Sequence, residues 1–208
     1  MVNMVVERIH RDTAMSYTTK HHYLKRVSPC NLAFGLFVDD MLGMPCIKGV
    51  IVYGVPPSST LLRGICGEDE ANNVYELNRV WVADDMPKNT ESHFIAQTLK
   101  HLDREIIVSY ADSAQGHVGI IYQATNWIYT GMTNPIKDPR VKGLEHQHHC
   151  TYAHSMSKAE LEEKYGDRLY WVARSKKHRY VIFACDKRRR KELRKKLKYP
   201  ALPYPKGE

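Results

Sequence analysis

The N-terminal part of the chain alternates short apolar runs with one polar segment. Residues 5–10 and 31–38 have the apolar content and length of strands, and residues 46–53 follow after a turn, which predicts a β-hairpin. Asp12 is a suitable N-cap for a helix over residues 13–26. The pattern therefore predicts the order β-α-β-β.

Residues 74–82 have the clearest strand pattern. Regular alternation of side chains predicts one face with Tyr75, Leu77, Arg79 and Trp81, and an opposite face with Glu76, Asn78 and Val80. Both faces then carry polar groups in mid-strand, which a strand buried in a core would avoid. This strand is therefore a candidate for part of a functional site.

A helix–strand–helix pattern follows. Asn89 opens a helix with helical spacing of apolar residues, residues 105–110 form a short apolar strand, and residues 116–127 predict a second helix. Residues 132–154 show no hydrophobic period and are rich in Pro, Gly and His. We therefore expect a long loop there.

The C-terminal third opens with a capping-box spacing. Ser157 and Glu160 predict the start of a short helix, and Gly166 predicts its end. Residues 169–173 and 179–185 are then expected to pair as a final hairpin.

The order of these elements predicts the fold class. Alternating strands and helices in the middle of the chain indicate an α/β (α+β) fold with a central mixed sheet and helices on both faces. We expect one domain over residues 1–185, with a basic C-terminal segment over residues 186–208 that packs on that domain or extends it.

Composition narrows the class of protein. The chain has 208 residues, of which 43% are apolar and 26% charged, as in globular domains. No apolar run approaches the ~20 residues that cross a bilayer, and no secretory pattern opens the sequence. The five cysteines are odd in number and form no CxxC pair, which favours reduced thiols. We therefore expect a cytosolic protein with no membrane partner.

Charge is concentrated at the C-terminus. Residues 175–208 hold 13 Lys/Arg and 3 Asp/Glu, a balance of +10 within a total of +8. Only Leu193 and Leu197 recur with helical spacing, so a helix here would dock by a narrow stripe. Such a segment predicts double-stranded DNA as partner, and the alternative is a solvated tail or a localisation signal. Binding to a membrane would need a broader apolar face. The candidate DNA-binding residues are Lys187, Arg188, Arg189, Arg190, Arg194, Lys195 and Lys196.

Two resemblances give this pattern a function. The element order resembles the Gcn5-related N-acetyltransferase (GNAT) fold, which predicts a GNAT-like acyltransferase domain. Residues 76–82, 109–112 and 116–131 resemble the Mom family of bacteriophage DNA-modification proteins. The endings at 177–180 and 198–205 resemble that family as well.

The Mom resemblance implies a specific reaction. It implies a transferase that adds a methylcarbamoyl (carbamoylmethyl) group to N6 of adenine in double-stranded DNA, which protects phage DNA from restriction. Two alternatives remain: an N-acyltransferase for a small-molecule or protein amine, and a non-catalytic DNA-binding anti-restriction protein.

The donor site is expected where two parallel strands separate and the next helix begins. Helix N-termini favour anions, so an acyl-CoA or related donor would meet Lys88, Asn89, Thr90 and Ser92. The glycine-spaced phosphate loop usual in the GNAT fold is absent, and the acids Asp84, Asp85 and Glu91 occupy the region. A changed donor site or a different donor would explain this departure.

Arg79 is the first candidate catalytic residue. A cation among apolar neighbours in mid-strand is tolerated when it is paired or lies at the edge of a site. The structural alternative is an ion pair with Glu76 or Asp112.

Four further candidates follow the short strand. Ser109, Tyr110 and Asp112 lie at a strand exit, where ligands gather in open α/β sheets. Asp112 orients or deprotonates the substrate, or alternatively caps the next helix. Tyr122 occupies the position of the GNAT tyrosine that protonates a leaving group, a role implied by the resemblance alone.

Adenine chemistry needs a base taken out of the stack, and aromatic side chains can hold such a base. Tyr53, Tyr110 and Trp127 are candidates for stacking, with packing in the core as the alternative. The histidines of residues 146–150, with His154, favour a solvated or DNA-facing loop. No clear ligand motif supports a metal, although iron remains an open cofactor.

Overall fold

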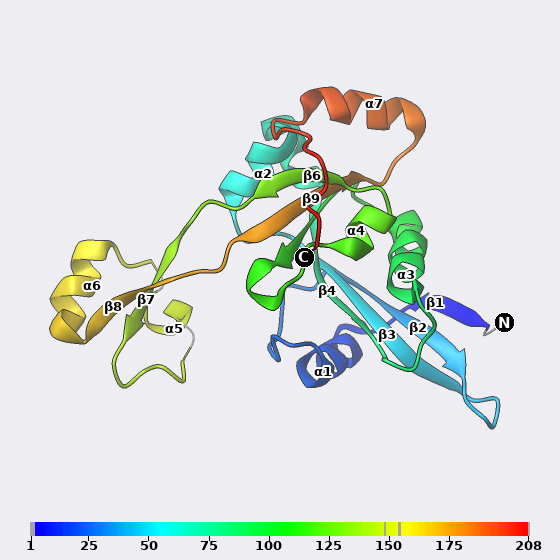
Figure 1. Ribbon diagram of the computed structural model, residues 1–208, viewed down its shortest axis with the longest axis horizontal. Helices are drawn as coiled ribbons and strands as arrows, with labels where there is room; N and C mark the ends of the chain where they lie inside the picture. The colour runs from blue at the N-terminus through cyan, green and yellow to red at the C-terminus, as the bar shows by residue number, and fades with distance from the viewer. Residues whose placement is uncertain (1–2, 148, 154, 208) are drawn as a thin grey trace.

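The computed structural model of the chain describes residues 3–147, 149–153 and 155–207. Its main sheet has seven strands in the order β1-β2-β3-β4-β5-β9-β6, and β7 and β8 form a separate two-stranded sheet (Figure 1). The strands are β1 (Met4–Arg8), β2 (Leu32–Asp39), β3 (Pro45–Gly54), β4 (Val74–Val82), β5 (Ile106–Asp112), β6 (Ile128–Met132), β7 (Lys137–Val141), β8 (Leu169–Ala173) and β9 (Lys177–Phe183).

Helices cover both faces of the main sheet, as the sequence predicts. The helices are α1 (Arg11–His21), α2 (Ser59–Cys66), α3 (Thr90–Thr98), α4 (Ile120–Ala124), α5 (His149–Ala153), α6 (Lys158–Tyr165) and α7 (Lys187–Lys196). The α/β class and the mixed sheet are thereby confirmed. No helix within the described ranges is long and apolar enough to cross a bilayer.

The buried side chains form a layer on each side of the sheet. On one face, Phe94 and Ile95 of α3 pack with the aromatic and aliphatic residues of β2, β3 and β5. On the other face, α1 packs on the start of the sheet, and α2 and α7 pack on Val74 and Ile106 at the beginnings of β4 and β5. Helices α2 and α7 therefore cover the beginnings of β4 and β5 but not the ends of these strands.

The first helix differs from its expected bounds. Helix α1 ends at His21, five residues before the expected end, and His22 has an extended backbone. The N-cap is His10, whose Nδ1 accepts the Asp12 N–H at 3.3 Å, so Asp12 is not the cap. The hairpin of β2 and β3 is confirmed.

Helix α2, strand β6 and, within the segment expected to be a loop, β7 and α5 were not predicted. Helix α2 is capped by the Ser58 hydroxyl at Leu61 N–H, and β6 begins directly after Trp127. The helix expected over 116–127 is reduced to the five residues of α4. Gly116 and Gly119 adopt left-handed backbone angles, so the regular helix begins only after Gly119.

The C-terminal pairing also differs from expectation. Strand β8 pairs with β7, inside the segment expected to be a loop, and β9 pairs with β5 and β6. The pairing depends on contacts distant in sequence, so residues 169–173 and 179–185 do not form a hairpin. The helix with the capping box, α6, is confirmed from Ser157 to Gly166.

We name residues 133–176 the β7–β8 arm. It leaves the main sheet after β6, carries β7, α5, α6 and β8, and returns to the sheet at β9. Figure 1 shows it projecting away from the seven strands.

Strand β4 contains an irregularity that the sequence pattern concealed. Val52 pairs with Arg79 and Tyr53 with Leu77, so Asn78 is an extra residue opposite β3. Because a bulge interrupts the alternation, Glu76 and Arg79 point to the same face. The expected assignment of these two side chains to opposite faces is therefore wrong.

The parallel pairing of β4 with β5 is short. It runs from Val74–Ile106 to Glu76–Val108, and beyond this point the two strands separate. The separation that the GNAT-like pattern predicts thus lies directly before the bulge.

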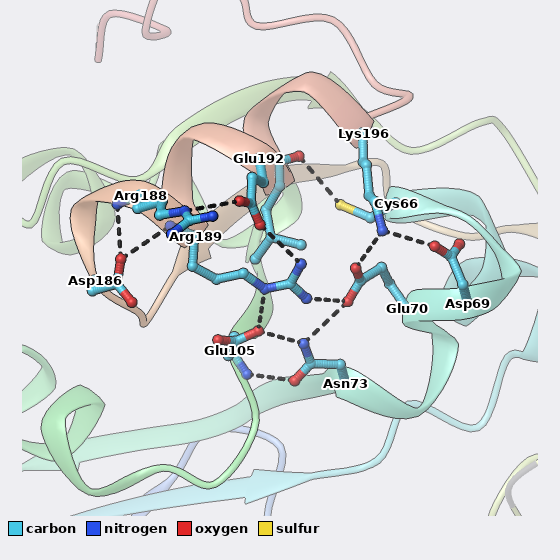
Figure 2. A network of polar contacts seen from close by, with 11 residues as sticks. Cys66, Asp69, Glu70, Asn73, Glu105, Asp186, Arg188, Arg189, Glu192 and Lys196 are labelled. Carbon is cyan, nitrogen blue, oxygen red and sulfur yellow. Dashed lines mark hydrogen bonds and ion pairs between the residues drawn. The ribbon is translucent and has the colours of Figure 1, made fainter.

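Helix α7 is fixed to the sheet by a cluster of ion pairs (Figure 2). Glu70 is 5% exposed and accepts bonds from Arg189 Nη2 and Lys196 Nζ, each at 2.6 Å. Arg189 Nε also bonds Glu105 at 2.9 Å, and Lys196 bonds Asp69 at 2.7 Å. Leu193 is fully buried beneath the helix, as the narrow apolar stripe predicts.

The last residues run back along the edge strand β6. Leu202 N–H bonds Tyr129 O at 2.9 Å, and Tyr204 OH bonds Trp127 O at 2.8 Å. The Arg179 guanidinium lies 3.5 Å from the centre of the Tyr199 ring. The segment is therefore attached to the domain. We propose that residues 186–208 are a basic segment packed on a domain of residues 1–185.

Glu70→Gln tests the ion-pair cluster. Burial alone raises the pKa of Glu70, but the bonds from Lys196, Arg189 and Asn73 outweigh it and lower the pKa to about 2. Removing one member of a buried cluster should lower the free energy of unfolding by about 3 kcal/mol at neutral pH, measured by chemical denaturation.

The control is Glu68→Gln, which breaks an exposed pair with Arg63 and should cost under about 1 kcal/mol. A lowered folded-state pKa gives stability above the unfolded value of 4.5 that is lost as pH falls toward 2. The difference between wild type and Glu70→Gln should therefore shrink below pH 4.5. Equal effects of the two substitutions at neutral pH would contradict this assignment.

Candidate active site

A cavity of about 480 Å³ lies where β4 and β5 separate. It is bounded by the residues after α1, the second half of β4, the end of β5 and the loop that leads into α4. Three of the predicted catalytic residues, Arg79, Tyr110 and Tyr122, line it. The cavity is therefore the candidate active site.

Among the residues that the structure describes, no carboxylate pairs with the buried Arg79. It is 8% exposed, and its Nη1 donates to Asn78 O at 2.7 Å. Its Nε has no hydrogen-bond partner, and no ion pair to it forms in the described part of the chain. Burial and the nearby Arg26 lower its pKa. The structural alternative, an ion pair with Glu76 or Asp112, is therefore absent within those residues.

Glu76 is a candidate that the sequence analysis did not assign. The bulge places it on the same face as Arg79, and it lines the cavity. Burial raises the pKa of its carboxyl group, and Lys177 and Arg79 oppose that shift. A carboxyl group with a raised pKa in a cavity has the properties of a general base. The sequence feature that could have identified Glu76 is its polar side chain in the middle of a strand.

Ser109 and Tyr122 form a hydrogen-bonded pair on the opposite face. Their hydroxyl oxygens are 2.8 Å apart, and Ser109 Oγ lies 2.9 Å from Leu77 O. Because a carbonyl only accepts and serine has one proton, Ser109 donates to Leu77 O when Tyr122 donates to Ser109. Burial raises the pKa of Tyr122 to about 12, so it keeps its proton at neutral pH.

Asp112 follows Ala111, which lines the cavity, but does not line it. Its Oδ1 accepts the Ala114 N–H at 3.0 Å, which is the capping role given as the alternative. Its Oδ2 is 4.0 Å from Lys177 Nζ. Strand alternation puts Asp112 and Tyr110 on the same face of the sheet as Arg79, so these predicted residues lie on one side of the molecule.

The aromatic lining differs from the expected one. Trp127 and Tyr53 are completely buried, which is the core alternative, whereas Tyr110 lines the cavity. Trp81 and Tyr23 also line it, and the rings of Trp81 and His21 stack at 4.4 Å. His21 and Tyr23 were not assigned to the site because both fall within the helix expected over residues 13–26.

His22 is neutral at physiological pH. Burial, followed by Arg79 and His117, lowers its pKa to about 4. A neutral imidazole beside an unpaired guanidinium adds no positive charge to the cavity, so Arg79 is the main buried cation there.

The predicted donor residues surround the start of α3. Thr90 is buried and its hydroxyl donates to Pro87 O at 2.6 Å, while the Ser92 hydroxyl donates to Asn89 O at 2.9 Å. Lys88 is exposed. One of the acids that disfavoured a phosphate here, Asp85, is paired with Lys48 at 2.6 Å.

A second cavity, of about 670 Å³, extends along α3. Asn89 and Ser92 line it, together with Lys100 and with Arg190 from α7. Two predicted donor residues and one predicted DNA-binding residue thus meet in one hollow. Thr90 and Lys88 do not line it.

The predicted DNA-binding residues fall into two groups. Arg189 and Lys196 are held in the ion-pair cluster, so their charges are neutralised within the domain. The remaining five are exposed: Lys187, Arg188, Arg190, Arg194 and Lys195. Helix α7 packs at the beginning of β5 and the first cavity opens at its end, a separation of ~20 Å at the rise of a strand. Helix α7 therefore lies away from the opening of this cavity.

The histidine run of the arm is described in part. His148 and His154 lie outside the described residues. Within the described ones, no group of three or more His, Cys, Asp or Glu side chains is placed to hold a metal ion. His149 lies 3.6 Å from Asp138, which also binds Arg174.

Comparison with known proteins identifies relatives. The model of the Mom protein family matches residues 3–206. The methylcarbamoylase Mom of Escherichia phage Mu is 28% identical over 210 residues, covering 90% of this chain and 77% of that protein.

Solved structures similar to the chain include an IAA acetyltransferase from Bacillus cereus (12% identity, TM-score 0.43, covering 87% of this chain and 99% of that one). The structure of the protein yncA from Salmonella typhimurium with its cofactor acetyl-CoA has 9% identity and a TM-score of 0.46. The match covers 88% of this chain and 95% of that one. An N-acetyltransferase from Staphylococcus aureus Mu50 has 9% identity and a TM-score of 0.47, and the match covers 88% of this chain and 99% of that one.

Arg79→Met tests whether the buried guanidinium serves function at the expense of stability. An apolar side chain of similar length removes an unpaired buried charge, so the free energy of unfolding should stay unchanged or rise by up to about 2 kcal/mol.

The matched control is Arg179→Met, which removes a stacked guanidinium that bonds Thr130 and should cost about 1–3 kcal/mol. Chemical denaturation measures both. If Arg79→Met costs as much as Arg179→Met, Arg79 is a structural residue.

Proposed function

The chain belongs to the Mom protein family, and from this premise we propose that it is a DNA-modifying transferase acting on adenine. The group transferred to N6 is the methylcarbamoyl (carbamoylmethyl) group, and the substrate is double-stranded DNA. The observation that carries the proposal is the family match over residues 3–206, supported by the relative named methylcarbamoylase. Phage DNA modified in this way would resist restriction.

The cavity has the size and lining for an everted base. N6 of adenine is inaccessible for this chemistry inside a duplex, so the nucleotide must turn out of the stack. A volume of about 480 Å³ is within the range of pockets that hold small ligands. Tyr23, Trp81 and Tyr110 provide aromatic surface beside the polar groups of β4.

Glu76 and Arg79 supply the polar chemistry. The exocyclic amine is a weak nucleophile. As the N6–carbon bond forms, the bond between that carbon and the donor's leaving group breaks, the leaving group keeps the electron pair, and N6 releases one proton. Glu76, with its raised pKa, accepts that proton. The Arg79 guanidinium, with an unused Nε–H, donates to the amide oxygen of the carbamoylmethyl group and holds its methylene carbon toward N6.

The remaining predicted residues have supporting roles. Ser109 donates to Leu77 O across the separated strands and accepts a hydrogen bond from Tyr122. Tyr122 keeps its proton at neutral pH and passes it to a leaving group when its bond to Ser109 breaks. Tyr110 provides cavity wall, and Asp112 orients Lys177 at the rim.

The donor is an acyl-CoA or related molecule in this proposal. The second cavity suits its phosphates, because Lys100 and Arg190 contribute positive charge beside Asn89 and Ser92. The hydroxyls of Thr90 and Ser92 are already bonded to backbone carbonyls, so the backbone of the first turn of α3 would contribute more than its side chains. When bound, such a donor supplies an activated carbon for transfer.

The proposal is tested by mass analysis of nucleosides from cells that express the protein. Wild type should yield a carbamoylmethyl adduct of deoxyadenosine. Glu76→Gln should lower the amount by about 10²–10⁴-fold, the usual contribution of general base catalysis, while duplex affinity stays within about twofold.

Glu68→Gln, an exposed acid removed from the cavity, is the control and should modify DNA as wild type does. Unmodified DNA in the wild-type cells, despite binding, would indicate a non-catalytic DNA-binding protein. An adduct level unaffected by Glu76→Gln would exclude Glu76 as the base.

A further inference from the structure

We propose that the β7–β8 arm binds duplex DNA and holds it beside the active-site cavity. The choice of DNA as partner rests on the proposed function.

The arm is attached at the rim of the cavity. Lys177 begins β9 and lines the cavity, and Lys176 precedes it. The Lys176 carbonyl accepts bonds from both the N–H and the hydroxyl of Ser113 at 3.2 and 2.6 Å. At the other end of the arm, the Thr133 N–H donates to Lys177 O at 2.9 Å, and the Thr133 hydroxyl accepts the Lys177 N–H at 3.0 Å. A ligand held by the arm is therefore held next to the cavity.

The strands of the arm are positively charged. Residues 137–141 and 169–177 contain five Lys or Arg and one Asp. The acid, Asp138, is already bonded by Arg174 at 2.6 and 3.0 Å. Lys137 and Lys176 are exposed, and no ion pair to either forms among the residues that the structure describes. This excess matches a polyanion such as the phosphate backbone.

Strand β8 exposes apolar side chains that a solvated ribbon would not need. Tyr170, Trp171 and Val172 are 36%, 38% and 42% exposed, and they are consecutive. Alternation places Tyr170 and Trp171 on opposite faces of the ribbon, opposite Arg140 and Pro139. Aromatic rings next to cations are typical of nucleic-acid-binding surfaces.

The dimensions suit a duplex. Trp171 lies six positions before Lys177, which is ~20 Å of extended chain, or about six nucleotides along one DNA strand. The major groove is about 12 Å wide and admits a two-stranded β-ribbon. The ribbon of β7 and β8 can therefore lie in a groove while the everted base enters the cavity.

Helix α7 does not meet this need by itself, because it lies at the other end of β4 and β5. Its exposed cations can contact phosphates of the same duplex only at a distance from the reacting base. Helix α6 carries Glu160, Glu162 and Glu163, so the ribbon rather than α6 faces the DNA.

Fluorescence anisotropy with a labelled duplex oligonucleotide tests the proposal. The arm variant is Trp171→Ala with Lys137→Gln and Lys176→Gln. At physiological salt its Kd should rise at least tenfold, and the slope of log K against log salt should fall by about two, one for each charge removed.

The matched control removes the same chemistry elsewhere. Leu42→Ala with Arg8→Gln and Arg11→Gln takes away one exposed apolar side chain and two exposed cations, and should leave the Kd within twofold of wild type. Thermal melting of each variant shows that it is folded. Lys137→Gln with Lys176→Gln is the alternative if the triple arm variant melts early, with the same change in salt slope.

Each result has one meaning. An arm variant that binds duplex as tightly as wild type overturns the proposal, as does a wild-type protein that binds no duplex. An adenine adduct in the wild-type cells would in both cases leave the proposed function standing. Arm-dependent duplex binding without any adduct would instead leave the arm as a DNA-binding element and remove the proposed enzymatic function.

Discussion

The separation of β4 from β5 is the constraint on which the site depends. A parallel ladder that stops after three residue pairs leaves backbone groups of both strands without their usual partners. Ser109 Oγ satisfies one of them at Leu77 O, and Tyr122 in turn bonds Ser109. The opening therefore persists without an unsatisfied carbonyl at that position. The cavity, its aromatic walls and its buried cation all occupy space that a continued ladder would close.

The two ends of these strands have different electrostatic character. At the beginning, acids and bases neutralise one another, so α7 is held by a cluster in which Glu70 is nearly inaccessible to solvent. At the end, Arg79 forms no ion pair with a carboxylate within the described residues, and Glu76 lines the same cavity. The first arrangement stabilises the fold. The second retains unused hydrogen-bonding capacity that a substrate can satisfy.

Sequence patterns predicted the elements whose signals are local. The bounds of β4 and the capping box of α6 were correct, because alternation and a cap are set by neighbouring residues. The pairing of β8 with β7 was missed, since strand partners are chosen by contacts across the fold. Arg79, Tyr110 and Tyr122 were found in the cavity, but Glu76 was not assigned, because the bulge at Asn78 leaves no mark in the alternation.

That bulge has a consequence for how the chain can vary. Glu76 and Arg79 share a face because an odd number of residues has been added between paired positions, so the site is determined by parity as well as by composition. A homologous strand could retain every side chain of this site and still lose the constellation by the deletion of one unremarkable residue. Single-residue gaps in this strand therefore carry more information about activity than conservative exchanges do.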